Sequence, residues 1–291
     1  MARSDAVDPA CLTIDGRRIG AGTPPYVIAE VSGNHNKDIG KALAMIDAAK
    51  EAGADAVKFQ TYTADSLTLP SNKADFQITT GTWAGWNLHE LYTEAATPYE
   101  WFPQLFERAR EVGITLFSSP FDSQSVDLLE DWGAPAYKIA SNEFTDWPLL
   151  KKCAETGKPL ILSTGTATLE EIQATVAFLE KIDAPDYALL HCVSAYPAPL
   201  SAANLTTIPA IAERFGVLAG FSDHTLGVTA AIAATALGAA IIEKHFILDR
   251  ADGGPDSSFA IEPDELALLC RSVREAHDTL GQPDFGMNDA E

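Results

Sequence analysis

YVIAEVS at positions 26–32 is the first of eight short apolar stretches that decide the fold of this 291-residue chain. The other seven are DAVKFQTY (55–62), ITLFSSP (114–120), PAYKIAS (135–141), PLILSTG (159–165), YALLHCV (187–193), VLAGFSD (217–223) and AAIIEKHF (239–246). Their apolar residues are continuous and do not alternate with polar ones, which is typical of strands covered on both faces. Each stretch therefore predicts a buried strand of a parallel sheet.

Helix-like segments lie between and after these predicted strands. They are 39–53, 98–113, 122–133, 145–157, 168–181, 204–216, 226–238 and 263–281, and most of them end in glycine, a frequent residue at helix C-termini. We expect Thr145 to cap the helix at 145–157. Eight strands that alternate with eight helices over about 260 residues predict an α/β fold of the (β/α)8 TIM-barrel type. An open doubly wound sheet is the alternative, but it would normally have fewer strands and a glycine-rich first turn.

Three segments flank or interrupt this repeating pattern. The N-terminal segment 1–25 contains CLTIDGRRIGAG (11–22), which predicts a β-hairpin around its Asp-Gly pair that plugs the bottom of the barrel. The barrel domain is expected to span 26–281, and 282–291 to form a flexible tail. The connection at 65–97 is too long for an ordinary strand-to-helix loop and is expected to act as a lid.

The expected lid carries several aromatic residues: Trp83, Trp86, His89 and Tyr92. We expect these side chains to pack the lid against the rim of the barrel, because large aromatic rings bury much apolar area. Direct stacking on a sugar is the alternative.

Charge and cysteine content narrow the possible functions. Twenty Lys and Arg against 41 Asp and Glu give a formal net charge of −21, which disfavours nucleic acids and anionic membranes as partners. The four cysteines are far apart, so neither a zinc site nor a disulfide framework is expected. The N-terminus has no apolar signal core, and no apolar run reaches the ~18 residues of a membrane helix. We therefore expect a cytoplasmic protein that binds small molecules.

Lysines and serines follow the predicted strands. Lys58, Lys138 and Lys244 lie inside apolar stretches, where lysine is rare unless it has a partner. Because TIM-barrel active sites lie at the C-terminal ends of the strands, we expect the three lysines to form one anion site. Serines at the ends of the third, fourth, fifth and seventh strands add donors suited to a phosphate and a carboxylate. The alternative is that each lysine pairs with a carboxylate, for which Glu30, Glu143 and Glu243 are the candidates.

Two histidines end neighbouring predicted strands, His224 on the seventh and His245 on the eighth. Neighbouring strands lie about 4.8 Å apart, so the two imidazoles can share one divalent metal ion. The carboxylates Glu30 and Asp256 are expected near the same rim. Two histidines with oxygen ligands and open positions suit Mn²⁺, Fe²⁺ or Zn²⁺ acting as a Lewis acid.

Seven motifs in order resemble the sialic acid synthase family: IAEVSGNHN (28–36), GADAVKFQTY (53–62), FSSPFD (117–122), YKIASNE (137–143), ILSTG (161–165), GFSDHTLG (220–227) and EKHF (243–246). Two further stretches, TPYEWFPQLFERA (97–109) and RADGGPDSSFAIEP (250–263), are most similar to the pseudaminic acid synthase branch. The resemblance implies a TIM-barrel enzyme that condenses phosphoenolpyruvate with an acetamido-sugar aldehyde and releases phosphate. The implied sugar is 2,4-diacetamido-2,4,6-trideoxy-altrose, giving pseudaminic acid, with N-acetylneuraminate or legionaminate synthesis as alternatives.

The resemblance also implies roles for individual residues. Phosphoenolpyruvate would be held by Lys58, Ser119, Lys138, Ser141, Ser163, Ser194 and Ser222. The sugar would face Gln60, Glu143, Tyr196 and Asp256. Catalysis would depend on Glu30 as the acid and base, with Lys58 and Lys138. A divalent metal ion would bind His224 and His245, most often Mn²⁺, with Mg²⁺, Co²⁺ or Zn²⁺ as alternatives.

The family resemblance implies a homodimer. Family members normally carry a small C-terminal antifreeze-like domain, and the sequence ends at Glu291, just past the expected barrel. Either the sequence is truncated before that domain or the protein lacks it. Two other functions are compatible with the residues. One is a Schiff-base aldolase that uses Lys58 or Lys138 as its nucleophile. The other is an inactive sugar-phosphate-binding or regulatory subunit.

Overall fold

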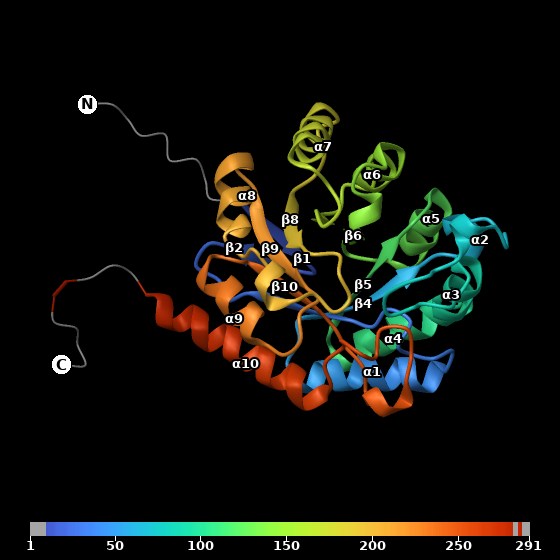
Figure 1. The fold of residues 1–291 in the computed structure, drawn as a ribbon. Coiled ribbons are helices and arrows are strands. Elements are labelled where there is room, and N and C mark those ends of the chain that lie inside the picture. The colour runs from blue at the N-terminus through green and yellow to red at the C-terminus, as the bar shows by residue number, and fades with distance from the viewer. Residues whose placement is uncertain (1–9, 282–284, 287–291) are drawn as a thin grey trace.

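The computed structural model describes residues 10–281, 285 and 286. Its centre is a closed barrel of eight parallel strands in the order β10-β3-β4-β5-β6-β7-β8-β9 (Figure 1). The strands are β3 (Tyr26–Glu30), β4 (Ala56–Thr61), β5 (Thr115–Pro120), β6 (Tyr137–Ile139), β7 (Leu160–Ser163), β8 (Tyr187–Cys192), β9 (Leu218–Asp223) and β10 (Ile241–His245). The eight predicted strands are thus confirmed, and the predicted TIM barrel with them.

Helices surround the barrel and cover the outer face of the strands (Figure 1). They are α1 (Ile39–Glu51), α4 (Phe102–Val112), α5 (Ser123–Trp132), α6 (Trp147–Ala154), α7 (Leu169–Lys181), α8 (Thr207–Phe215), α9 (Thr229–Ala236) and α10 (Pro263–Leu280). One predicted cap is wrong by one residue: α6 begins after Asp146, whose side chain accepts a hydrogen bond from the Leu149 amide, 3.0 Å away, and Thr145 precedes it. Aspartate and threonine are both good caps, so the pair could not be separated from the sequence.

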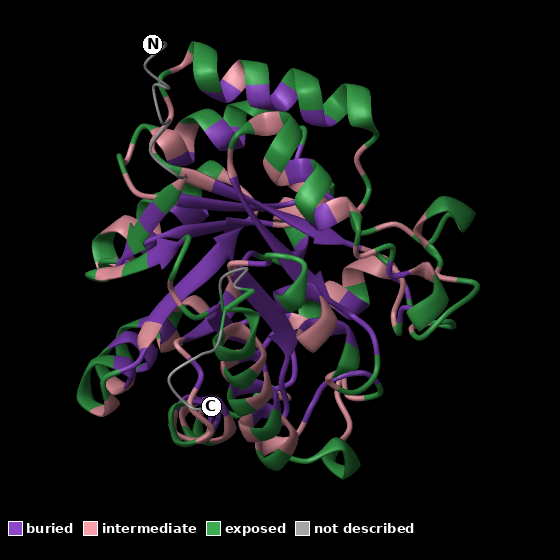
Figure 2. Cartoon of the chain, turned by 90° about the vertical axis from the view of Figure 1, so that its left-hand side faces the viewer, coloured by how far each residue is buried: buried purple, intermediate pink, exposed green. Residues whose placement is uncertain are grey.

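The strands are buried on both faces, whereas the helices expose their outer sides (Figure 2). One apolar cluster fills the space between sheet and helices, with Val27, Phe59 and Leu162 among its members. A second cluster lies inside the barrel and includes Ile28, Phe117 and Ile241. This double burial explains why the strands have continuous apolar sequences.

A β-hairpin closes the N-terminal end of the barrel. Strands β1 (Cys11–Ile14) and β2 (Arg17–Gly20) pair antiparallel, and Leu12, Ile14 and Ile19 join the inner apolar cluster. That cluster also contains residues from the starts of several barrel strands. The predicted hairpin plug is therefore confirmed.

The connection after β4 carries α2 (Ala64–Leu67), the short 3-10 helix η1 (Ala74–Phe76) and α3 (Leu88–Ala95) beside the C-terminal ends of the strands (Figure 1). Four more 3-10 helices complete the elements: η2 (Tyr99–Trp101), η3 (Ser141–Glu143), η4 (Leu200–Ala202) and η5 (Arg250–Asp252). Within the described residues, none of the helices combines the length and apolar character needed to cross a membrane. The predicted tail, 282–291, lies outside the described residues except for positions 285 and 286.

Candidate active site

A cavity of about 520 Å³ opens at the C-terminal ends of the barrel strands. Thirteen of the residues predicted for the site line it: Glu30, Lys58, Gln60, Lys138, Ser141, Glu143, Ser163, Ser194, Tyr196, Ser222, His224, His245 and Asp256. Ser119 joins them through a hydrogen bond that its hydroxyl accepts from Lys58 over 3.2 Å. The structure thus brings all fourteen side chains together.

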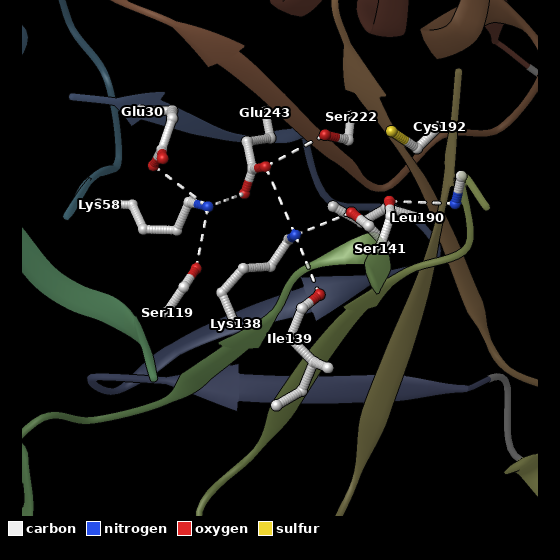
Figure 3. A network of polar contacts seen from close by, with 12 residues as sticks. Glu30, Lys58, Ser119, Lys138, Ile139, Ser141, Leu190, Cys192, Ser222 and Glu243 are labelled. Atoms are coloured by element: carbon white, nitrogen blue, oxygen red, sulfur yellow. Dashed lines mark hydrogen bonds and ion pairs between the residues drawn. The ribbon is translucent and has the colours of Figure 1, made fainter. Parts of the chain in front are cut away.

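Lys58 is the centre of an ionic cluster at the floor of this cavity (Figure 3). Its Nζ lies 3.1 Å from Glu30 Oε2 and 3.3 Å from Glu243 Oε2, and no more than 5% of any of the three side chains is exposed. Apart from these ion pairs with Lys58, Glu30 Oε2 and Glu243 Oε2 accept no hydrogen bond from the described residues. These two oxygens therefore keep hydrogen-bonding capacity for a ligand.

Lys138 extends the same cluster toward β7. Its Nζ donates to Ser163 Oγ over 2.8 Å and to the Ile139 carbonyl over 3.2 Å, and it lies 3.6 Å from Glu243 Oε1 (Figure 3). Ser222 donates to the same Glu243 oxygen over 3.1 Å. Glu243 therefore bridges the two lysines. The sequence identified it only as a possible partner of a lysine, and not as part of the site.

The predicted cluster of three lysines is only partly correct. Lys244 is fully buried but pairs with Asp223, its Nζ 2.9 Å from Oδ2. Alternate residues of a strand point to opposite faces, so if Glu243 and His245 line the cavity, Lys244 must point away from it. Lys244 thus pairs with a carboxylate, as in the alternative, but its partner is Asp223 and not one of the three glutamates expected. Lys58 and Lys138 share Glu243 and a cavity.

Burial and charge move the pKa values of this cluster in opposite directions. Burial raises the pKa of Glu30, and Lys58 only partly offsets that effect. Burial would also raise the pKa of Glu243, but Lys138 and Lys58 together hold it below its usual range. Burial lowers the pKa of Lys138 despite the nearby Glu243. The cluster thus combines two lysines with one carboxylate that they hold ionised and one carboxyl whose burial favours the neutral form, which suits an anionic ligand.

Hydroxyl groups gather around Gly165 at the end of β7. The Gly165 amide donates to Ser141 Oγ over 3.1 Å. A Cβ atom at position 165 would lie 2.5 Å from Ser194 Oγ, 2.8 Å from Ser141 Oγ and 3.0 Å from Cys192 Sγ. A side chain at position 165 would displace these three groups, so glycine allows them to approach one another. The thiol of Cys192 in the cavity wall was not predicted.

The two predicted metal-binding histidines lie side by side, with ring centroids 5.2 Å apart. Two imidazoles bound to one ion at about 2.1 Å have ring centres about 5 Å apart, so the pair fits a shared ion. His224 Nδ1 lies 2.9 Å from the Val193 carbonyl, which fixes the ring and leaves Nε2 for a ligand.

His245 Nδ1 is buried 3.2 Å from Asp256 Oδ2 without a hydrogen bond to any described residue. In the described part of the chain, no three or more His, Cys, Asp or Glu side chains form a group arranged to hold a metal ion. The histidine pair is thus at most an open site, in which water or a substrate would supply further ligands.

The residues predicted to face the sugar line the same cavity. Gln60 donates to Glu30 Oε1 over 2.7 Å and to Ser32 Oγ over 3.2 Å. The Tyr196 ring packs on His224, with 4.4 Å between centroids. Burial raises the pKa of Glu143 to about 7, and its Oε2 has no hydrogen-bond partner among the described residues. These groups present both donors and acceptors to the cavity.

The lid segment supplies an apolar wall that the sequence did not identify in full. Leu67, Ile78, Leu88, Leu91 and Tyr92 line the cavity together with Trp83. Trp83 Nε1 donates to the Pro255 carbonyl over 2.7 Å, and its ring lies 5.2 Å from that of Tyr196. Trp83 therefore packs on the rim, as expected, and also faces the cavity.

The mouth of this closed parallel barrel carries lysines, paired carboxylates and serine hydroxyls. This combination is typical of enzymes that bind a small anionic substrate. The chain belongs to the NeuB family, whose family model matches residues 45–284. It is 44% identical to the pseudaminic acid synthase of Helicobacter pylori over 265 residues, covering 91% of this chain and 78% of that relative. It is 46% identical to the pseudaminic acid synthase of Campylobacter jejuni serotype O:23/36 over 256 residues, covering 88% and 75%.

A solved structure has the same fold. The N-acetylneuraminic acid synthetase of Leptospira borgpetersenii, crystallised in complex with citrate, superposes with a TM-score of 0.87 at 34% sequence identity. The match covers 97% of this chain and 94% of that one. The resemblance found in the seven sequence motifs is thus confirmed, and so is the similarity to pseudaminic acid synthases.

Proposed function

We propose that this protein is a nonulosonic acid synthase that condenses phosphoenolpyruvate with 2,4-diacetamido-2,4,6-trideoxy-altrose, producing pseudaminic acid and phosphate. The observation that carries the proposal is the buried cluster of Lys58, Lys138, Glu30 and Glu243 at the mouth of the barrel. The similarity to pseudaminic acid synthases over about nine-tenths of the chain supports the choice of sugar.

The floor of the cavity is suited to phosphoenolpyruvate. This substrate carries about three negative charges, which need cationic groups and hydroxyl donors for binding and orientation. Lys58 and Lys138 supply the charge, and the hydroxyls of Ser119, Ser141, Ser163, Ser194 and Ser222 supply neutral donors. The raised pKa of Glu30 lets it take up a proton when the substrate enters, so that Lys58 is free to pair with the anion.

Glu30 is the proposed acid and base. C3 of the enol attacks the aldehyde carbon of the open-chain sugar, and the aldehyde oxygen takes a proton. Positive character at C2 is then quenched by water, which gives up a proton, and phosphate leaves with cleavage of the C2–O bond. The balance is one phosphoenolpyruvate, one aldehyde and one water for one 2-keto-3-deoxy sugar acid and one phosphate. A carboxyl with a raised pKa is suited to give and receive these protons.

The sugar would lie between the ionic floor and the lid. Gln60, Glu143, Tyr196 and Asp256 offer hydrogen bonds to its hydroxyl and acetamido groups. The apolar wall around Trp83 fits the acetyl methyl groups and the deoxygenated C6 of the proposed sugar. A hexose rich in hydroxyl groups would leave more of its polar groups unpaired against this wall.

His224 and His245 would hold a divalent ion, for which we propose Mn²⁺. When bound, the ion would polarise the aldehyde carbonyl as a Lewis acid. Tyr196 and Asp256, which lie against the two imidazoles, would orient the sugar next to them.

Several broader features belong to the same proposal. We propose a homodimer in the cytoplasm, which the family resemblance supports and which light scattering and cell fractionation test. The division into 1–25, 26–281 and 282–291 is likewise proposed, and limited proteolysis with mass mapping tests it.

One observation favours a second candidate. Burial lowers the pKa of Lys138, as a lysine nucleophile of a Schiff-base aldolase requires. Borohydride reduction in the presence of pyruvate would trap such an adduct as a mass increase on Lys138. The synthase proposal predicts that no adduct forms.

The deciding assay is phosphate release from phosphoenolpyruvate with a panel of acetamido sugars. We expect release with the diacetamido-trideoxy sugar, together with a product whose mass equals that of the sugar plus pyruvate. Release with N-acetylmannosamine alone would move the assignment to N-acetylneuraminate synthesis. Binding of phosphoenolpyruvate without release for any sugar would favour an inactive binding subunit.

A further inference from the structure

The ends of β9 and β10 present two different faces. Ser222, His224, Glu243 and His245 line the cavity. The residues between them, Asp223 and Lys244, have side chains that are 0% exposed and form a pair behind the cavity wall. Because neighbouring residues of a strand point to opposite faces, this pair lies directly behind the two histidines.

The buried pair also holds the backbone beyond β9. Lys244 Nζ lies 2.9 Å from Asp223 Oδ2 and donates a second hydrogen bond to the carbonyl of Thr225. Asp223 Oδ1 accepts a hydrogen bond from the Thr225 amide over 2.8 Å. The residues on both sides of His224 are therefore connected to Lys244, the residue that precedes His245.

These bonds begin where the pairing of β9 with β10 ends. The register of the two strands runs through Ile242–Phe221 and Glu243–Ser222 to Lys244–Asp223, and His245 pairs with Glu30 of β3. His224 follows the last residue of β9. Its position relative to His245 therefore depends on contacts outside the β9–β10 ladder. Val193 and Ala198 hold His224 from the β8 side, the latter through an amide that donates to the His224 carbonyl over 2.9 Å, and Lys244 holds it from the β10 side.

Stability alone is a weak explanation for this pair. Two charges taken completely out of water lose their hydration, and apolar residues of similar volume often serve as well. Groups outside the ligand shell, by contrast, commonly set the orientation of ligating histidines. The Lys244–Asp223 pair contacts neither imidazole, but it holds the backbone on both sides of His224.

We propose that Lys244 is a positioning residue that fixes His224 against His245, so that both imidazoles can bind one divalent cation. The inference rests on the proposed function, in which these two histidines hold the metal ion. Lys244 itself touches neither the cavity nor a substrate. Its effect is on metal affinity, through the loop at Thr225.

The test is a titration of the metal-free full-length protein with Mn²⁺, in which electron paramagnetic resonance reports the free ion. The main variant is Lys244→Met with Asp223→Asn, which removes the bond to Thr225 without leaving an unpaired charge. We expect Mn²⁺ affinity to fall by about 10- to 100-fold, with little change in the melting temperature of the metal-free protein. Lys244→Arg retains donors and should bind Mn²⁺ more tightly than the double variant.

Two reference variants distinguish an error in the proposed metal site from an error in the role of Lys244. Arg274→Met removes an ion pair with Asp55, 3.1 Å long and remote from the histidines, and should leave Mn²⁺ affinity unchanged. His224→Ala should abolish tight binding. If His224→Ala binds Mn²⁺ as well as the wild type, the proposed metal site is wrong and the inference falls with it. If His224→Ala loses the ion but the double variant binds within twofold of the wild type, only the role of Lys244 is wrong.

Discussion

The ammonium group of Lys58 lies 3.1 Å from the carboxylate of Glu30, and 4% and 1% of the two side chains are exposed. Such a pair is costly to bury, and apolar residues could hold a barrel together equally well. Its position at the mouth of the barrel, with a raised pKa for Glu30, gives it a different use. In the proposed mechanism, protonation of Glu30 would release the charge of Lys58 for an incoming anion, and the prediction for Lys58 depends on this relationship.

Replacement of Lys58 should affect stability and activity separately. Lys58→Met leaves Glu30 and Glu243 buried without their shared cation, which should destabilise the protein by about 3–5 kcal/mol in thermal or urea unfolding. Adding Glu30→Gln should recover most of that loss. Phosphate release should remain at least about 100-fold below wild type in both variants. Recovery of activity in the double variant would contradict a role of Lys58 in substrate binding.

The raised pKa of Glu143 predicts a pH-dependent gain in stability for Glu143→Gln. The pKa is about 7 in the folded protein, against an ordinary value of 4.5, so the folded state is stabilised by the protonated form. That stabilisation is complete below pH 4.5 and is lost as the pH rises through 7. Glu143→Gln should therefore melt at the wild-type temperature near pH 4.5 and at a higher temperature at pH 8.5. If Glu143→Gln and the wild type melt at the same temperature at pH 8.5 as well as at pH 4.5, the pKa of Glu143 is not raised.

Replacement of Trp83 and replacement of Trp86, both in the lid segment, should differ in their effect on the KM for the sugar. Trp83 lines the cavity and packs on Tyr196, so Trp83→Ala should raise the KM for the sugar by about 3- to 10-fold. The KM for phosphoenolpyruvate should stay within twofold. Trp86 is on the same segment but 42% exposed, and Trp86→Ala is the matched control. Equal effects of both substitutions on the sugar would show that only the packing of the lid matters.

Removal of divalent ions should stop turnover reversibly. Chelator treatment should abolish phosphate release, and added Mn²⁺ should restore it, because His224 and His245 lie close enough to share an ion. His224→Ala should not recover with Mn²⁺. Full activity in excess chelator would refute the metal site.

Most of the fold could be predicted from the sequence because both faces of every barrel strand are covered. Continuous apolar stretches such as LILS in β7 are typical of parallel strands that are buried on both faces. Helix ends were less certain, as at Thr145 and Asp146, because two adjacent residues could form the same cap.

The candidate site was also largely predictable, since strand ends in a barrel converge. Two features differ from the prediction. The direction of Lys244 could have been derived from strand alternation, because its neighbours Glu243 and His245 both line the cavity. The lid residues Leu67 and Ile78 line the cavity through the path of a long loop, for which the sequence carries no periodic signal.

In the proposed reaction, phosphoenolpyruvate loses phosphate by cleavage of its C2–O bond after the new carbon–carbon bond has formed. The most direct test uses phosphoenolpyruvate labelled with ¹⁸O in the bridging position, incubated with the protein, Mn²⁺ and the diacetamido-trideoxy sugar. Mass spectrometry of both products gives the fate of the label. The proposed reaction places the ¹⁸O in the released phosphate and none in the sugar acid. Label retained in the sugar acid, or phosphate released without the sugar, would contradict it.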